Sequence, residues 1–277
     1  MSAAVAGDPV AAARSVAEEG ARAYQRVFAD RFVAAYALGS LAHGGYAPAV
    51  SDIDLAVLLA DVRGGDAETV AETGRILRER GEPYRRLSVF WGSVTALSRG
   101  QDDGRFPAID RLDLAEHGLL LLGSDVAGRV AVPDADELLV DGARFALDVL
   151  ATDEVIAEVH QPRRLLHDPV WFTKAVLFPV RFFYSSAVTM GRAATNDDAI
   201  GWYLDRPGAV ATPLVRLAAA VRTGAPLHEA EAAPLLAAGL RQLYRRYAEE
   251  QAERLRQAGA PDDLVAALTR WRGRLGD

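Results

Sequence analysis

Two short segments, close together in the chain, contain residues that could bind phosphate and a divalent cation. The first is Gly39-Ser40, and the second carries Asp52 and Asp54. Residues two apart on a strand point to the same face of a sheet, so both carboxylates could reach one Mg²⁺, which prefers oxygen ligands. A turn at Gly39-Ser40 lacks bulk, so backbone amides and the Ser40 hydroxyl could approach phosphate oxygens. We therefore predict a magnesium and triphosphate site at these four residues.

The specificity of this prediction comes from the combination of the two segments. An Asp-x-Asp pair on a strand is usually part of a solvated face, and Gly-Ser is usually an ordinary turn. Together, in this order and spacing, they indicate a site for nucleotide transfer.

Apolar periodicity predicts the elements that must position these residues. The first half of the chain is expected to alternate helices and strands, and the second half to be mainly helical. A short strand or turn is expected within 119–132. The predicted helices are 9–28, 66–80, 141–159, 169–191, 209–223 and 229–258, and the predicted strands are 32–38, 52–59 and 84–91. This order predicts an α+β fold with a mixed sheet in a first domain (1–140), followed by a helical bundle domain (141–277).

Composition excludes several classes of protein. The 277 residues include no cysteine, so thiol redox chemistry and thiolate metal sites are ruled out. The start of the chain lacks the features of a secretory signal, and its apolar runs are too short to span a membrane, so a cytoplasmic protein without membrane contact is expected. The net charge of -7 argues against nucleic acid as a partner and suits a cationic small molecule. The oligomeric state is not predicted.

The block from Leu38 to Val57 resembles the nucleotidyltransferase fold of the DNA polymerase β-like superfamily. The whole chain resembles the two-domain aminoglycoside adenylyltransferases that inactivate streptomycin and spectinomycin. The run from Arg181 to Thr189, followed by Gly191, supports the narrower resemblance. The resemblance implies an N-terminal nucleotidyltransferase domain that holds Mg²⁺ and ATP, and a helical domain that clamps substrate and nucleotide.

The resemblance also implies nucleotide-binding residues in the second half. In the family, an arginine on the corresponding helix contacts ATP phosphates, and this role passes to Arg181. Arg192 lies near the place of a phosphate-binding lysine of the family. Lys174 lies two helical turns before Arg181, so both could face the same cleft, although a solvated position is the commoner outcome for such a lysine.

One position departs from the family pattern. A glutamate on the third strand activates the attacking hydroxyl in the family, and the best alignment places Ser88 there. A neutral serine is a poor base near pH 7, and general-base assistance is typically worth roughly 10²- to 10⁴-fold in rate. A carboxylate from the following loop and helix could replace the glutamate, and sequence alone does not choose between Asp102, Asp103, Asp110, Asp113 and Glu116. An acceptor that ionises easily is the other way in which transfer could proceed without the glutamate.

Two functions follow most directly from these residues, whereas the acidic net charge and the absence of basic arms argue against a third, nucleotide transfer to a protein or RNA. The first is transfer of AMP from ATP to a hydroxyl of a small, cationic acceptor such as an aminoglycoside, with Asp52 and Asp54 as the catalytic metal ligands. The alternative is a nucleotide-binding protein that has lost catalysis at Ser88.

Overall fold

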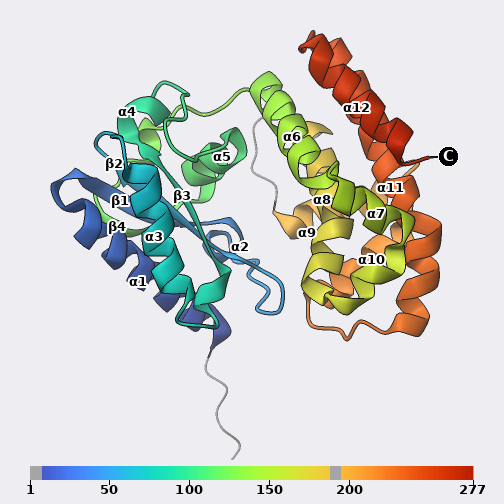
Figure 1. Ribbon diagram of the computed structural model, residues 1–277, viewed down its shortest axis with the longest axis horizontal. Helices are drawn as coiled ribbons and strands as arrows, with labels where there is room; N and C mark the ends of the chain where they lie inside the picture. Colours follow the sequence, from blue (N-terminus) through green and yellow to red (C-terminus); the bar gives the residue numbers. More distant parts are fainter. Residues whose placement is uncertain (1–7, 188–194, 277) are drawn as a thin grey trace, which may run out of the picture. The chain divides into compact units, whose positions relative to one another are not determined.

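The protein is described by a computed structural model that covers residues 8–187 and 195–276. The chain divides into two compact units, Met1–Pro133 and Asp134–Asp277 (Figure 1). The first unit combines a sheet with helices and the second is helical, which confirms the predicted α+β fold class.

The first unit is built on a four-stranded mixed sheet. Its strands lie in the order β3-β2-β1-β4; β2 and β3 are parallel, and the other pairs are antiparallel. The strands are β1 (Phe32–Leu38), β2 (Ile53–Leu59), β3 (Leu87–Ser93) and β4 (Leu119–Gly123). The helices are α1 (Pro9–Phe28), α2 (Gly39–Ala42), α3 (Asp66–Arg78), α4 (Val94–Leu97) and α5 (Ala108–His117), and the short 3-10 turns are η1 (Ala29–Arg31), η2 (Tyr84–Arg86) and η3 (Ala127–Arg129).

Alternation along the strands divides the core of this unit into two layers. On β2, Ile53 and Leu55 pack with helices α1 and α3 on one face (Figure 1). Ala56 and Leu58 pack on the opposite face, with residues of α4 and α5. Side chains alternate between the faces of a strand, so Asp54 projects from the face that α5 covers.

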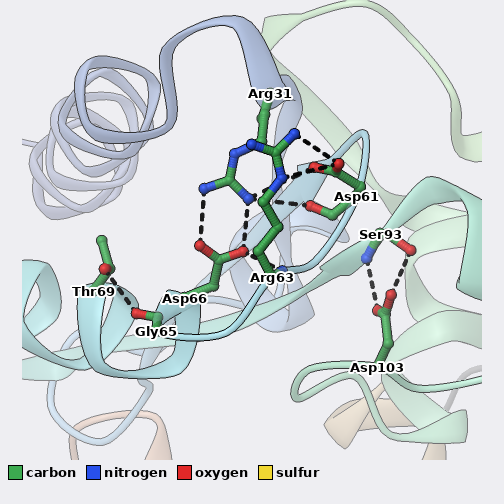
Figure 2. Close-up of polar contacts among 8 residues, drawn as sticks. All are labelled: Arg31, Asp61, Arg63, Gly65, Asp66, Thr69, Ser93 and Asp103. Carbon is green, nitrogen blue, oxygen red and sulfur yellow. Dashed lines mark hydrogen bonds and ion pairs between the residues drawn. The ribbon is translucent and has the colours of Figure 1, made fainter.

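An ion pair ties the start of the sheet to helix α3. Arg31 donates two hydrogen bonds to Asp66, at 2.7 and 2.8 Å, and Figure 2 shows the guanidinium facing the carboxylate. The Arg63 amide also donates to Asp66, at 2.7 Å. The hydrogen bond from Arg31 is the largest cause that lowers the pKa of Asp66 below its usual value. This carboxylate therefore stabilises the fold in its ionised form.

The predicted third strand begins later than expected. Tyr84–Arg86 form a 3-10 turn because the Arg85 and Arg86 amides bond back to the carbonyls of Gly81 and Pro83, at 3.1 Å each. Strand β3 starts only at Leu87. Helix α3 ends at Arg78 rather than at residue 80, and Asp52 lies one residue before β2.

The second unit is a bundle of helices around an aromatic core that includes Tyr244, Tyr247 and Trp271. The predicted helix 141–159 is two helices, because the Thr152 hydroxyl accepts from the Val155 amide and starts a new helix. The helices are α6 (Ala135–Leu150), α7 (Asp153–His160), η4 (Pro162–His167, a 3-10 helix), α8 (Pro169–Ala187), α9 (Asn196–Asp205), α10 (Thr212–Arg222), α11 (Glu229–Gln257) and α12 (Asp262–Arg274). Helices α9 and α12 were not predicted. Within the described ranges, none of the helices could cross a membrane.

Candidate functional site

The Gly39-Ser40 turn lies at the end of β1 and begins the short helix α2. Gly39 has a φ of +59°, in the left-handed region that favours glycine. A Cβ built on Gly39 would lie 2.5 Å from Oδ2 of Asp54, which is closer than real contacts allow. Only glycine therefore lets the Asp54 carboxylate lie against this turn. Ser40 follows and is almost fully buried.

Strand pairing explains why Asp54 reaches the turn. Leu38, the last residue of β1, pairs with Asp54 on β2. Gly39 comes next in the chain and contacts the Asp54 carboxylate. The first two predicted parts of the site, the turn and the acidic strand, are thus adjacent in space.

The carboxylates at the site suit a magnesium ion whose other ligands are phosphate oxygens and water. Across the described residues, no three His, Asp or Glu side chains are grouped to hold a metal by themselves. Mg²⁺ commonly takes only one or two carboxylates and completes its shell with phosphate oxygens and water. The Asp54 carboxylate against the turn, with Asp52 two residues earlier, suits that arrangement.

Of the five acidic residues left open by the sequence, Asp113 is placed at the turn. Its Oδ2 accepts a hydrogen bond from the Gly39 amide at 2.5 Å, and the residue is 9% exposed. Gly39 therefore lies between two carboxylates, one from β2 and one from α5. The sequence does contain a signal for this position, because Asp113 stands between two leucines, Leu112 and Leu114, which the structure buries fully.

Two of the other acidic residues have structural roles nearby. Asp103 accepts from the Ser93 amide and hydroxyl at 2.8 and 2.5 Å, as Figure 2 shows. Asp102 accepts from the amides of Gly104 and Phe106 and closes the same loop. These hydrogen bonds organise the connection after β3.

Ser88 lies beside the acidic strand. The parallel register pairs Ser88 of β3 with Asp54 of β2, and the residue is half-buried. Ser88 also lines a cavity together with Asp52. A neutral hydroxyl therefore occupies the place next to Asp54 on the third strand.

The nucleotide-binding residues predicted in the second half lie in the helical unit. Arg181 and Lys174 are both on α8 and half-buried, and Arg192 lies outside the described residues. The Nε of Arg181 is buried and makes no hydrogen bond to any described group. Burial and, secondarily, the charge of Arg181 lower the pKa of Arg222, which pairs with Asp197 at 3.2 Å. Nucleotide binding by Arg181 and Lys174 stays a prediction.

Comparison with known proteins supports the fold at a distance. No protein-family model matches the chain, and the curated proteins contain no match. Among solved structures, the chain is similar to a spectinomycin adenyltransferase from Enterococcus faecialis, solved with ATP and spectinomycin. The identity is 10% and the TM-score 0.55, over 94% of this chain and 99% of the other. The likeness shows the fold alone, an α+β unit followed by a helical unit.

Proposed function

We propose that the protein is a nucleotidyltransferase that transfers AMP from ATP, with Mg²⁺, to an oxygen of a small-molecule acceptor. The observation that carries this proposal is the position of the Asp54 carboxylate directly against the Gly39-Ser40 turn. Phosphate-binding and cation-binding groups must be adjacent for such a reaction, and the pairing of β1 with β2, which brings Asp54 to the Gly39-Ser40 turn, supports these roles. The likeness to an adenyltransferase solved with ATP agrees with this proposal.

The residues of the first unit have different roles in the proposed reaction. The Ser40 hydroxyl and the turn receive the phosphates that leave as pyrophosphate. Asp113 holds the Gly39 amide and so fixes the conformation of the turn. Mg²⁺ held by Asp52 and Asp54 would neutralise charge on the phosphate oxygens. In the transfer, a bond forms between the acceptor oxygen and the α-phosphorus, and the bond to the bridging oxygen of pyrophosphate breaks.

The second unit contributes to nucleotide binding in this proposal. Arg181, with a buried nitrogen that makes no hydrogen bond to the described residues, would hold phosphate oxygens through charge-assisted hydrogen bonds. Lys174 on the same helix is the second candidate. Arg181→Ala should weaken ATP binding, whereas Arg216→Ala on α10 serves as a control. Equal affinity in the two variants would remove Arg181 from the site.

Binding and turnover are tested separately. ATP with Mg²⁺ at a hundredfold over its dissociation constant should stabilise the protein by about 2.7 kcal/mol. Pyrophosphate release is then measured with ATP, Mg²⁺ and a panel of acceptors. Aminoglycosides enter the panel because the similar structure contains spectinomycin, and carboxylates and phosphate esters complete it. Absence of ATP binding by both unfolding and calorimetry would refute the proposal.

A nucleotide-binding protein without turnover is the second candidate, and the neutral Ser88 beside Asp54 favours it. Ser88→Glu adds a carboxylate at this place. Release of pyrophosphate by the variant, with none from the wild type on any acceptor, would establish the second candidate. Turnover by the wild type would exclude it.

A further inference from the structure

A cavity of about 510 Å³ lies along β3, the strand at one edge of the sheet. All of its lining residues belong to the first unit. They include Asp52 and Ser88 of the candidate site, and Val70, Val89 and Trp91 form an apolar wall. The cavity therefore joins the acidic residues to a space large enough for a small molecule.

Arginines surround this cavity. Arg78 comes from α3, Arg85 and Arg86 from the turn η2, and Arg105 from the loop after β3. Among the described residues that line the cavity, Asp52 alone is acidic.

Most of the positive charge of these arginines is not neutralised by a carboxylate of the described residues. Arg105 donates to the Val89 carbonyl at 3.0 Å, and Arg78 to the Leu87 carbonyl at 3.5 Å, so neither bond involves a carboxylate. Arg86 does pair with Glu82, at 3.2 Å, and Arg85 is exposed. A positive cavity in a chain with a net charge of -7 is a local feature that favours an anion.

The strand order assigns the cavity to the acceptor rather than to the triphosphate. The Gly39-Ser40 turn follows β1, and β2 with its aspartates lies between β1 and β3, the strand along the cavity. The apolar wall of the cavity lies on the face of the sheet that α1 and α3 cover, so Asp52 and Ser88 connect the cavity to the candidate site. Attacking and leaving oxygens are roughly in line in phosphoryl transfer. If pyrophosphate leaves on the side of the turn, the acceptor attacks from the side of β3. Neither Gly39 nor Ser40 is among the described residues that line the cavity.

We infer that the acceptor is a small anion with an apolar part, a carboxylate or a phosphate ester, bound by the arginines of this cavity. The inference rests on the proposed function for the place of the triphosphate. Arginine matches both kinds of oxyanion through paired hydrogen bonds.

An ionised oxygen also resolves the absence of a base at Ser88. It attacks the α-phosphorus with its own electron pair, the bond to the bridging oxygen breaks, and pyrophosphate carries away the electron pair of that bond. No proton has to be removed from the nucleophile. The product is an anhydride between AMP and the acceptor.

Binding of simple probes tests the cavity without knowledge of the natural acceptor. Phenyl phosphate and benzoate combine an aromatic ring with an anion, and benzylamine is the cationic counterpart. Calorimetry on the wild-type protein should detect both anions and no benzylamine, and the stronger anion identifies phosphate or carboxylate as the preferred group. Arg85→Gln and the double variant Arg78→Gln/Arg85→Gln should weaken anion binding at least tenfold. Arg26→Gln, an exposed change on α1, should leave it unaltered.

Measurement of ATP binding separates this inference from the proposed function. ATP affinity should be the same in Arg85→Gln and the wild type, because the triphosphate lies at the turn. An equal loss of ATP and phenyl phosphate affinity would assign the cavity to the nucleotide and overturn the inference. Tighter binding of benzylamine than of either anion, or turnover restricted to cationic acceptors, would overturn it while the transferase function stands. Arginine-dependent binding of the anions without any ATP binding would refute the transferase and leave an anion site.

Discussion

Replacement of Gly39 by alanine should damage the site through two effects that the structure separates. An alanine at a φ of +59° takes up a left-handed conformation that costs about 1–2 kcal/mol. Its Cβ would also lie 2.5 Å from Oδ2 of Asp54, so the carboxylate has to move. Overpacking of this kind typically costs about 1–3 kcal/mol. We expect Gly39→Ala to lower the free energy of unfolding by about 2–5 kcal/mol and to abolish magnesium-dependent ATP binding.

Gly65→Ala is the matched control. Gly65 has a φ of +89°, and nothing lies within 4 Å of a Cβ built there. This variant carries only the backbone cost, about 1–2 kcal/mol, and should bind ATP like the wild type. The difference between the two variants in free energy of unfolding, measured in urea, gives the contribution of the Asp54 contact. Calorimetry measures ATP binding by each variant. Equal stability and normal ATP binding in both would refute the reasoning about Gly39 and Asp54.

Three further changes test the surroundings of the site. Asp113→Leu leaves the partly buried Gly39 amide without its acceptor and should lower the free energy of unfolding in urea by about 1–3 kcal/mol. Asp113→Asn retains an acceptor oxygen and should cost less. Equal losses in the two variants would show that the hydrogen bond does not matter. Asp54→Asn should abolish the stabilisation by ATP and Mg²⁺ in thermal unfolding, and retention of the full shift would remove Asp54 from the metal site. Asp66→Asn should lower the unfolding midpoint at pH 7. Arg31 lowers the pKa of Asp66 in the folded state, so the stabilisation is fully present above the unfolded pKa of about 4 and is lost as the pH falls through the lowered folded pKa. The unfolding midpoints of the wild type and Asp66→Asn should therefore converge in acid. A constant difference between them down to the lowest measurable pH would contradict this.

Local patterns in the sequence predicted the first elements closely. Helix α1 and strand β1 have the predicted bounds, because an apolar period and a Pro or Gly at the boundary are local signals. The prediction was wrong where a short hydrogen-bonded turn or a side-chain cap interrupts an apolar run. The 3-10 turn at Tyr84–Arg86 and the Thr152 cap are such interruptions.

For the candidate site too, some features follow from local sequence and others from tertiary structure. The sequence by itself determined that Gly39-Ser40 and the two aspartates stand at strand ends, because their types and spacing are properties of a short stretch of chain. Only the tertiary structure decided which of five acidic residues reaches the turn, because packing of α5 on the sheet brings Asp113 to Gly39 over 74 residues of separation.

The charge of the neighbouring cavity was also decided by tertiary structure. Arg78, Arg85 and Arg105 belong to a helix, a turn and a loop, and no short sequence pattern relates them. They surround one cavity because β3 forms the edge of the sheet, and that position follows from strand order. Strand order depends on long-range pairing, which the residues of one segment do not encode.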